Sequence, residues 1–286
     1  MNFRTDLAIE AVVECSVREE DVAQETREMG TLTLHRIRVL TPQGEAAVGK
    51  PRGRYVTAVL PPLTDNERDL TAHAAAIGRE LAAMLPPEGT VLVVGLGNRN
   101  VTPDALGPAT AGLVLATRHI GGEFARALGL ADLRPTAVVT PGVLGQTGTE
   151  SSETVRGVCR EIHPAAVIVV DALAAGRVER LGRTVQICDS GIAPGSGVGN
   201  DRRPLNREVL GVPVIGIGVP TVVDAATLVS EMSGQEIPPT DPPTMVTPRE
   251  VDVMISRAAR LLAMAIHCAL QPAYSPTELI EVAQGI

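Results

Sequence analysis

The sequence predicts a three-layer α/β/α fold, phosphorylase/hydrolase-like, with a mainly parallel central sheet and a β-rich N-terminal elaboration. From about residue 67 onward, short Val- and Ile-rich runs alternate with stretches of helical periodicity, which is typical of βαβ units. These runs are apolar at every position, as expected of strands that helices cover on both faces. The 286 residues are 44% apolar and 20% charged, so the chain can bury a large core and is not disordered.

We expect a single domain over residues 1–286, with three parts: a β-rich N-terminal part (1–62), an α/β core (63–270) and a C-terminal tail (271–286). In the first part, Thr31–Leu40 alternates apolar and polar residues, and Arg54–Leu60 follows a Pro/Gly-rich turn. Alternation with a period of two indicates strands with one covered face.

The α/β core is predicted from the alternation of two kinds of segment. The expected strands are Val91–Gly95, Thr136–Thr140, Ala166–Asp171, Thr184–Asp189 and Pro213–Gly218. The expected helices between them are Arg68–Leu85, Ala105–His119, Ser152–Ile162 and Thr221–Met232. A last helix is expected to run through Leu270, with Thr247 as its N-cap, Pro248 at its first position and Glu250 completing a capping box.

Composition excludes several classes of function. A formal net charge of −8 and only four aromatic residues, with no Trp, argue against direct nucleic-acid binding. The start of the chain has no apolar signal segment, and the longest uncharged run, Val209–Val223, is too short to span a membrane. The four cysteines have no CxxC spacing, so we expect a cytoplasmic protein without a metal or other cofactor. All basic residues are Arg except Lys50.

Gly-rich polar loops follow the predicted strands. Ligands of α/β sheets bind at the carboxyl ends of strands, so we expect these loops to form an active-site edge. Their backbone N–H groups could stabilise an oxyanion or hold a substrate. The candidate loop residues are Gly95, Gly97, Asn98, Glu150, Gly195, Ser196 and Gly197.

The loops do not fit other common motifs. The first begins Gly95-Leu96-Gly97 but has Asn100 where a dinucleotide fingerprint has its third glycine. Ser196 is not a nucleophile elbow, because Pro194 stands where that motif has glycine. Cys188 follows a strand without an obvious histidine to activate it, so a structural thiol is expected.

Two aspartates are candidate catalytic residues. Asp171 follows the apolar run VIVV, and Asp104 lies in a Thr-Pro-Asp sequence after the first loop. Asp171 could equally form a turn, and Asp104 could complement a helix dipole after a Thr102 N-cap. Asp224 and Glu150 fit capping boxes that begin at Thr221 and Thr147. Two carboxyl groups at adjacent strand ends would suit the activation of water for amide hydrolysis, but spacing alone does not separate these interpretations.

Long blocks of the sequence resemble the germination proteases of endospore-forming bacteria, which are related in fold to the hydrogenase maturation proteases. The resemblance extends from Arg4 to about Leu270 and includes the following blocks: RTDLAIEA (Arg4–Ala11), GKPRGRYVT (Gly49–Thr57), VVGLGNRNVTPDALGP (Val93–Pro108), PGVLGQTGTE (Pro141–Glu150), VVDALAAGRVERLGRTVQICDSGIAPGSGVGN (Val169–Asn200), LGVPVIGIGVPTVVDA (Leu210–Ala225) and MVTPREVD (Met245–Asp252).

The resemblance implies an endopeptidase that degrades small acid-soluble DNA-protecting proteins in the spore core during germination. It also implies a homotetramer, catalytic roles for Asp104 and Asp171, and a zymogen in which a propeptide is removed between Asp6 and Leu7. Cys188 and Ala193 stand where the family usually has Ser and His.

The environments of the two aspartates suggest separate roles. We expect a helix N-terminus to lower the pKa of Asp104, so that its carboxylate orients the attacking water. We expect burial to raise the pKa of Asp171, so that it holds the proton for the departing amine. Two alternatives remain open: a metal-dependent peptidase of the hydrogenase-maturation type, and a non-catalytic nucleotide-binding module.

Overall fold

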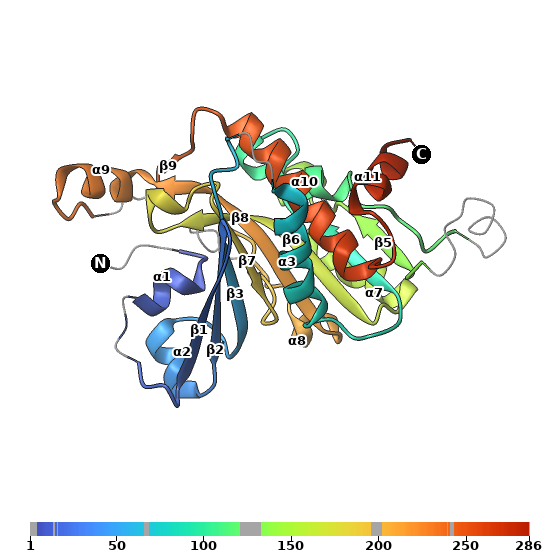
Figure 1. Ribbon diagram of the computed structural model, residues 1–286, viewed down its shortest axis with the longest axis horizontal. Coiled ribbons are helices and arrows are strands. Elements are labelled where there is room, and N and C mark those ends of the chain that lie inside the picture. The colour runs from blue at the N-terminus through green and yellow to red at the C-terminus, as the bar shows by residue number, and fades with distance from the viewer. Residues whose placement is uncertain are drawn as a thin grey trace.

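The computed structural model describes residues 5–13, 15, 17–65, 69–120, 133–195, 202–238, 240 and 243–285. The described strands form one nine-stranded sheet in the order β1-β2-β3-β7-β8-β6-β4-β5, with β9 (Met245–Val246) paired to β8. Figure 1 shows the strands of the N-terminal part at one end of this sheet and the helices α3 and α10 across one of its faces. The predicted α/β class is confirmed.

The parallel half of the sheet lies between two layers of helices. Its strands are β4 (Val91–Gly95), β5 (Thr136–Val139), β6 (Ala166–Ala175) and β8 (Val214–Asp224). Successive side chains of a strand point to opposite faces. On β6, Ile168 and Val170 therefore pack in the core cluster on one face of the sheet, while Val167 and Val169 pack in a second cluster on the opposite face.

Helices cover both faces of the parallel half. On one face lie α3 (Leu70–Ala82), α4 (Leu106–Ala111) and α10 (Val251–Leu270), and on the other lie α7 (Ser151–Ile162) and α8 (Arg207–Leu210). In the described part of the chain, α10 alone has the length and apolar composition of a membrane-spanning helix, but most of its residues are buried in the main core.

The other half of the sheet is antiparallel. It contains β1 (Val22–Met29), β2 (Leu32–Val39), β3 (Gly53–Val59) and β7 (Thr184–Cys188). The strands predicted around β2 and β3 are confirmed, whereas β1 was not foreseen because its sequence, VAQETREM, is charged and largely exposed. The short helices α1 (Ala8–Val13) and α2 (Pro42–Val48) belong to this half.

Several predicted boundaries are wrong. β8 continues to Asp224, so the helix expected from Thr221 is α9 (Ala225–Ser233), and the Asp224 side chain caps it by accepting from Ala226 N–H at 2.8 Å. The helix expected over Ala105–His119 ends at Ala111. The Thr247 hydroxyl donates to the Thr221 carbonyl at 2.8 Å instead of capping α10, which begins at Val251.

Three short elements and a terminal helix complete the described chain. The 3₁₀ helices are η1 (Thr102–Asp104) and η2 (Val178–Arg180), and α6 (Leu144–Thr147) is a single turn. In the predicted C-terminal tail, α11 (Pro276–Gly285) buries Leu279 and Ile280, so this segment is packed and helical.

The end of β4 and the start of α4 are in backbone contact. A Cβ atom at Gly95 would lie 2.3 Å from the Gly107 carbonyl oxygen, and one at Gly107 would lie 2.1 Å from the Leu96 carbonyl oxygen. Separations this short are not tolerated between Cβ and backbone atoms, so both positions require glycine. This contact fixes α4, and the η1 turn before it, against the end of the central strand.

We predict opposite effects of alanine at two glycines. Gly107→Ala forces α4 away from β4 and is expected to lower the free energy of unfolding by about 1–3 kcal/mol. Gly157→Ala, at an exposed position of α7 with nothing within 4 Å of its Cβ, is expected to raise it by about 0.5–1 kcal/mol. Urea unfolding measures both, and equal effects of the two substitutions would contradict the close contact.

Candidate active site

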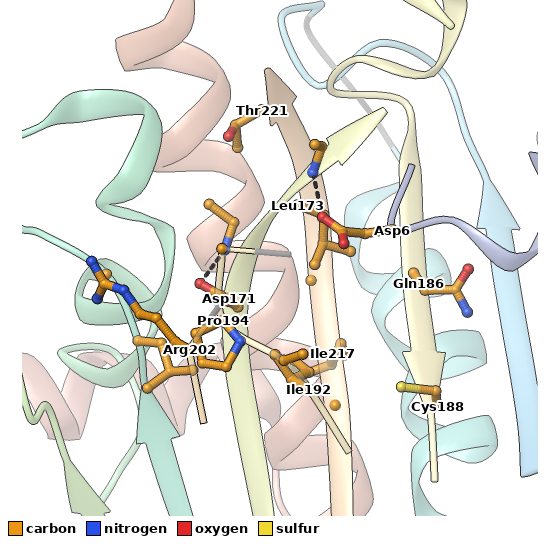
Figure 2. A pocket seen from close by; sticks show the side chains of 18 of the residues that line it. Asp6, Asp171, Leu173, Gln186, Cys188, Ile192, Pro194, Arg202, Ile217 and Thr221 are labelled. Atoms are coloured by element: carbon orange, nitrogen blue, oxygen red, sulfur yellow. Dashed lines mark hydrogen bonds between the residues drawn. The ribbon is translucent and has the colours of Figure 1, made fainter. Parts of the chain in front are cut away.

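A cavity of about 800 Å³ opens at the carboxyl ends of β4 and β6. Its walls come from segments far apart in the sequence: the loop after β4, the middle of β6, the loop after β7, the segment before β3 and the N-terminal residues Thr5 and Asp6. Figure 2 shows Asp171, Asp6, Gln186 and Arg202 around this cavity.

Asp171 lies within a strand and not at its end. β6 continues to Ala175, so the predicted strand boundary at Asp171 is wrong. The residue is 6% exposed, and its carboxyl group accepts the Ala172 N–H at 2.9 Å (Figure 2). Its neighbour in the register is Gly218, where a Cβ would lie 2.3 Å from the Asp171 carbonyl oxygen and 2.8 Å from the Leu173 side chain. Position 218 on β8 therefore requires glycine because the main chain of β6 and the Leu173 side chain lie so close to it.

Burial raises the pKa of Asp171 well above its ordinary value, because a desolvated carboxylate is unfavourable. The negative charges of Asp104 and Asp6 raise this pKa further, whereas the Ala172 hydrogen bond and the charge of Arg202 oppose the shift. The direction agrees with the expectation that Asp171 holds a proton.

Asp104 ends the η1 turn, which begins at Thr102 and has Val101, not Thr102, as its N-cap. Its carboxylate accepts the Asn98 N–H at 2.7 Å, so it binds the loop after β4 and does not cap a helix. The Thr221 hydroxyl holds the same turn by donating to the Pro103 carbonyl at 2.7 Å. Hydrogen bonds from two elements therefore position Asp104.

The expected lowering of the pKa of Asp104 is wrong. Burial raises this pKa, and the opposing effects of the Asn98 hydrogen bond and the Arg202 charge are smaller. The carboxylate accepts the Asn98 N–H of the loop after β4 instead of capping a helix. Burial thus raises the pKa of both carboxyl groups, and the shift is larger at Asp171.

The structure brings Asp104 and Asp171 to one cavity. Both side chains line it, and the charge of Asp104 acts on the pKa of Asp171. Arg202 also lines the cavity, and its charge opposes the rise in the pKa of both carboxyl groups.

The predicted loop residues differ in where they lie. Gly97 lines the cavity with φ +114°, and a Cβ there would lie 2.0 Å from the Asp104 carbonyl oxygen. Gly195 also lines the cavity, while Gly95 contacts α4 instead. The Asn98 N–H is already bonded to Asp104 and so serves the carboxylate and not an oxyanion.

Glu150 does not line the cavity. It is the N-cap of α7 and forms a capping box with Glu153, so the expected cap role is confirmed, although the box begins at Glu150 and not at Thr147. Ser196 and Gly197 lie outside the described residues.

The loop after β7 reaches the cavity by an unexpected path. β7 is antiparallel to β8, so its carboxyl end points away from the edge where β4 and β6 end. The chain then folds back over the sheet, where Ile192 covers Gly216: a Cβ at that glycine would lie 2.5 Å from the Ile192 side chain. An all-parallel strand order could not predict that the loop after β7 folds back to the cavity.

The N-terminal segment also lies in the cavity. Asp6 N–H donates to the Ala174 carbonyl at 3.0 Å, and its carboxylate accepts the Ala174 N–H at 2.8 Å (Figure 2). Leu7 follows and is fully buried in the N-terminal core cluster. Ala174 is three residues beyond Asp171, roughly 10 Å along the strand, so the Asp6–Leu7 bond lies at the level of Ala174 and not at that of Asp171.

Sequence analysis missed three polar residues of the cavity. Gln186 interrupts the apolar run of β7 and accepts the Ala8 N–H at 3.2 Å and the Thr57 hydroxyl at 2.9 Å. Lys50 was distinctive as the sole lysine, but the sequence did not place it in the cavity. Nothing in the sequence around Arg202 indicated its position.

The described residues contain no group of three or more His, Cys, Asp or Glu side chains arranged to hold a metal ion. Burial raises the pKa of the Cys188 thiol, which therefore stays protonated and is not an activated nucleophile. Asp104 and Asp171 share the cavity with other titratable residues, which are Asp6, Lys50, Tyr55, Cys188 and Arg202.

A deep cleft with convergent polar groups at the strand ends of an α/β sheet is the architecture of an enzyme. Residues 6–234 match the family model described as germination protease. The chain is 37% identical to a germination protease of Clostridium perfringens over 95% of this chain and 96% of the relative, and 39% identical to that of Caldanaerobacter subterraneus over 98% and 97%. The chain belongs to the germination protease family and is a peptidase.

Another relative is the germination protease of a Geobacillus strain, 42% identical over 80% of this chain and 66% of its own length. Among solved structures, a [NiFe] hydrogenase maturation protease, HycI from Thermococcus kodakarensis, is similar with a TM-score of 0.38 and 19% identity, covering 65% of this chain and 98% of that one.

We predict that Asp171→Asn stabilises the protein increasingly as pH rises. The pKa of Asp171 is raised in the folded state, so its ionisation opposes folding: the cost is absent below the unfolded pKa of about 3.9 and grows as pH rises through the folded pKa. Asn cannot ionise. In urea unfolding between about pH 4 and pH 8, the free energy of unfolding of the variant should rise relative to that of the parent chain as pH increases. Exposed Asp65→Asn is the control, and a pH-independent difference for Asp171→Asn would contradict its raised pKa.

Proposed function

We propose that this chain is an endopeptidase that begins the degradation of small acid-soluble spore proteins during germination. Membership of the germination protease family supports the substrate class. The observation that supports the chemistry is that Asp104 and Asp171 line one cavity and interact electrostatically there.

In this mechanism the two carboxyl groups share one proton. Asp171, whose pKa is raised more, holds the proton and donates it to the departing amine. Asp104, held by the Asn98 N–H, is the carboxylate that takes a proton from the attacking water. Because the groups interact, they titrate as a pair, and the assignment describes the dominant microstate.

The Gly-rich loops supply further groups for the reaction. Gly97 and Gly195 line the cavity, so their backbone amides are the candidates for stabilising the tetrahedral oxyanion. Arg202, which acts on both aspartates, adds positive charge on the same side of the cleft.

The biological setting belongs to the same proposal. We infer a cytoplasmic enzyme of the spore core that acts as a single-domain homotetramer without a cofactor and without direct nucleic-acid or membrane binding. It is made as a zymogen and processed between Asp6 and Leu7. Since that bond lies at the level of Ala174, processing requires either a shift of the N-terminal segment or a second copy of the enzyme.

A metal-dependent peptidase is the second candidate, because two carboxylates facing one cavity could together hold a divalent ion. It requires further ligands from water or substrate, since the described residues supply no third acidic, His or Cys ligand at that place.

We predict that Asp104→Asn and Asp171→Asn each lower kcat on a small acid-soluble spore protein by at least about 10²-fold, because each removes one member of the acid–base pair. The double variant should be little worse than either single one, since the two groups act as a unit. Asp65→Asn is the matched control.

Normal cleavage by both single variants would refute the aspartate mechanism. The assay is repeated with EDTA: activity that is lost with the chelator and restored by one added metal would favour the metal-dependent alternative, and unchanged activity supports the proposed mechanism.

A further inference from the structure

Glu10 on α1 is a buried carboxyl group that the proposed reaction does not use. The residue is 5% exposed. Its Oε2 atom accepts the Gly176 N–H, from the residue after β6, at 2.8 Å and also accepts the Thr5 hydroxyl. Its Oε1 atom is buried and has no hydrogen-bond partner among the described residues. A buried carboxyl oxygen without a donor is unfavourable, so this group has capacity for a further hydrogen-bond donor.

The surroundings of Glu10 favour a positively charged partner. Burial raises the pKa of Glu10, because the ionised form is poorly solvated. The hydrogen bonds from Thr5 and Gly176 oppose this rise, and the positive charges of Arg180 and Arg177 do so to a smaller extent. A cation in place of the Thr5 hydroxyl would stabilise the carboxylate more strongly, because hydrogen bonds between charged groups are stronger than those of neutral donors.

The Thr5 hydroxyl links Glu10 to the main chain at Leu7. It accepts the Leu7 N–H at 3.0 Å while it donates to the Glu10 carboxylate. Two consecutive hydrogen bonds therefore join Leu7 N to Glu10 Oε2, which places these two atoms at most about 6 Å apart. A Cβ atom at Gly176 would lie 3.2 Å from both Glu10 Oε2 and Thr5 Cβ, so the carboxylate and Thr5 pack against the same glycine.

The place of Glu10 in the sequence suits a contact with the nitrogen of Leu7. Leu7 directly precedes α1, and its carbonyl accepts the Ala11 N–H at 3.4 Å, as an N-cap residue does. Glu10 is the third residue of α1. From this position a glutamate side chain can reach back to the main-chain nitrogen of the N-cap residue, as in a capping box. In this structure the Thr5 hydroxyl stands between the two groups.

Cleavage between Asp6 and Leu7 would change this arrangement. Water breaks the amide bond, the new carboxylate leaves with Thr5 and Asp6, and the nitrogen of Leu7 becomes an α-ammonium group. Leu7 is fully buried in the N-terminal core cluster, so the new cation forms beside apolar side chains and needs an anionic partner. Departure of Thr5 removes the hydroxyl that occupies both Leu7 N and Glu10 Oε2.

We propose that the Glu10 carboxylate is the binding site for the α-ammonium group of Leu7 in the processed chain, and that this ion pair holds α1 beside the active-site cavity. The start of α1 contacts the cavity wall, because the Ala8 N–H donates to Gln186 Oε1 at 3.2 Å. The inference rests on the processing step proposed above and adds the group that receives the new chain end.

The test measures the pKa of the α-ammonium group of Leu7. In the full chain, residues 3–6 are replaced by Ile-Glu-Gly-Arg, and an added protease that cuts after this sequence makes Leu7 the first residue. The pH dependence of acylation, followed by mass spectrometry, gives the pKa, with Lys50 as the only other amine. Pairing with Glu10 should raise this pKa from the ordinary 7.7–8.0 to above about 9, which slows acylation near pH 7 about tenfold.

Glu10→Gln should bring the pKa of the Leu7 ammonium below the ordinary range, because burial then acts without the negative charge. The amide oxygen of the variant can still accept the Gly176 N–H. The matched control is Glu20→Gln, at a side chain that is 67% exposed, and it should keep the raised pKa. The same pKa in the parent and in Glu10→Gln would overturn the proposal.

A second chain keeps Glu10 and displaces the charge. Ile-Glu-Gly-Arg replaces residues 2–5 and is combined with Asp6→Gly, so that the cut leaves one glycine before Leu7. The ammonium of this glycine should have an ordinary pKa, and a pKa raised as much as that of Leu7 would contradict the pairing. Since the added protease makes the cut, failure of the unaltered chain to process itself would overturn the proposed processing and leave this result intact.

Discussion

The site depends on keeping a carboxyl group inside an apolar strand. Asp171 lies on the central strand β6, between residues that belong to the core on either side, and its carboxyl group accepts the Ala172 N–H. Desolvation of a carboxylate is costly, and protonation relieves that cost. Burial therefore raises the pKa of Asp171, and its ionisation opposes folding as pH rises. On the neighbouring strand, Gly218 leaves room for the Asp171 carbonyl oxygen and the Leu173 side chain.

Asp104 reaches the same cavity through a second constraint, the backbone contact between β4 and α4. Gly95 and Gly107 let these elements approach at distances that no side chain would allow, and Gly97 does the same under the η1 turn. The hydrogen bond from Asn98 then orients the carboxylate. Glycines in the first loop therefore serve to place an acidic side chain.

The apolar runs predicted the parallel strands well, because a strand covered on both faces has an unambiguous composition. The ends of strands and helices were less predictable. A helix was expected to begin at Thr221, but β8 continues through Pro220 and Thr221. Pairing of β8 with β6 and β9 outweighs the local preference of this sequence. Asp104 and Asp171 were found by resemblance, whereas spacing left them ambiguous. The positions of Lys50, Gln186 and Arg202 depend on antiparallel pairing and on a returning loop, which no local pattern encodes.

The central claim is that two carboxyl groups share one cleft closely enough to share a proton. It is tested most directly by following the titration of the Asp171 side-chain carbon by NMR in the parent chain and in Asp104→Asn. Loss of the neighbouring negative charge should lower the pKa of Asp171, although burial keeps it above the ordinary value. A pKa of Asp171 that is the same in both proteins would show that the two aspartates do not act on one another and would contradict the account.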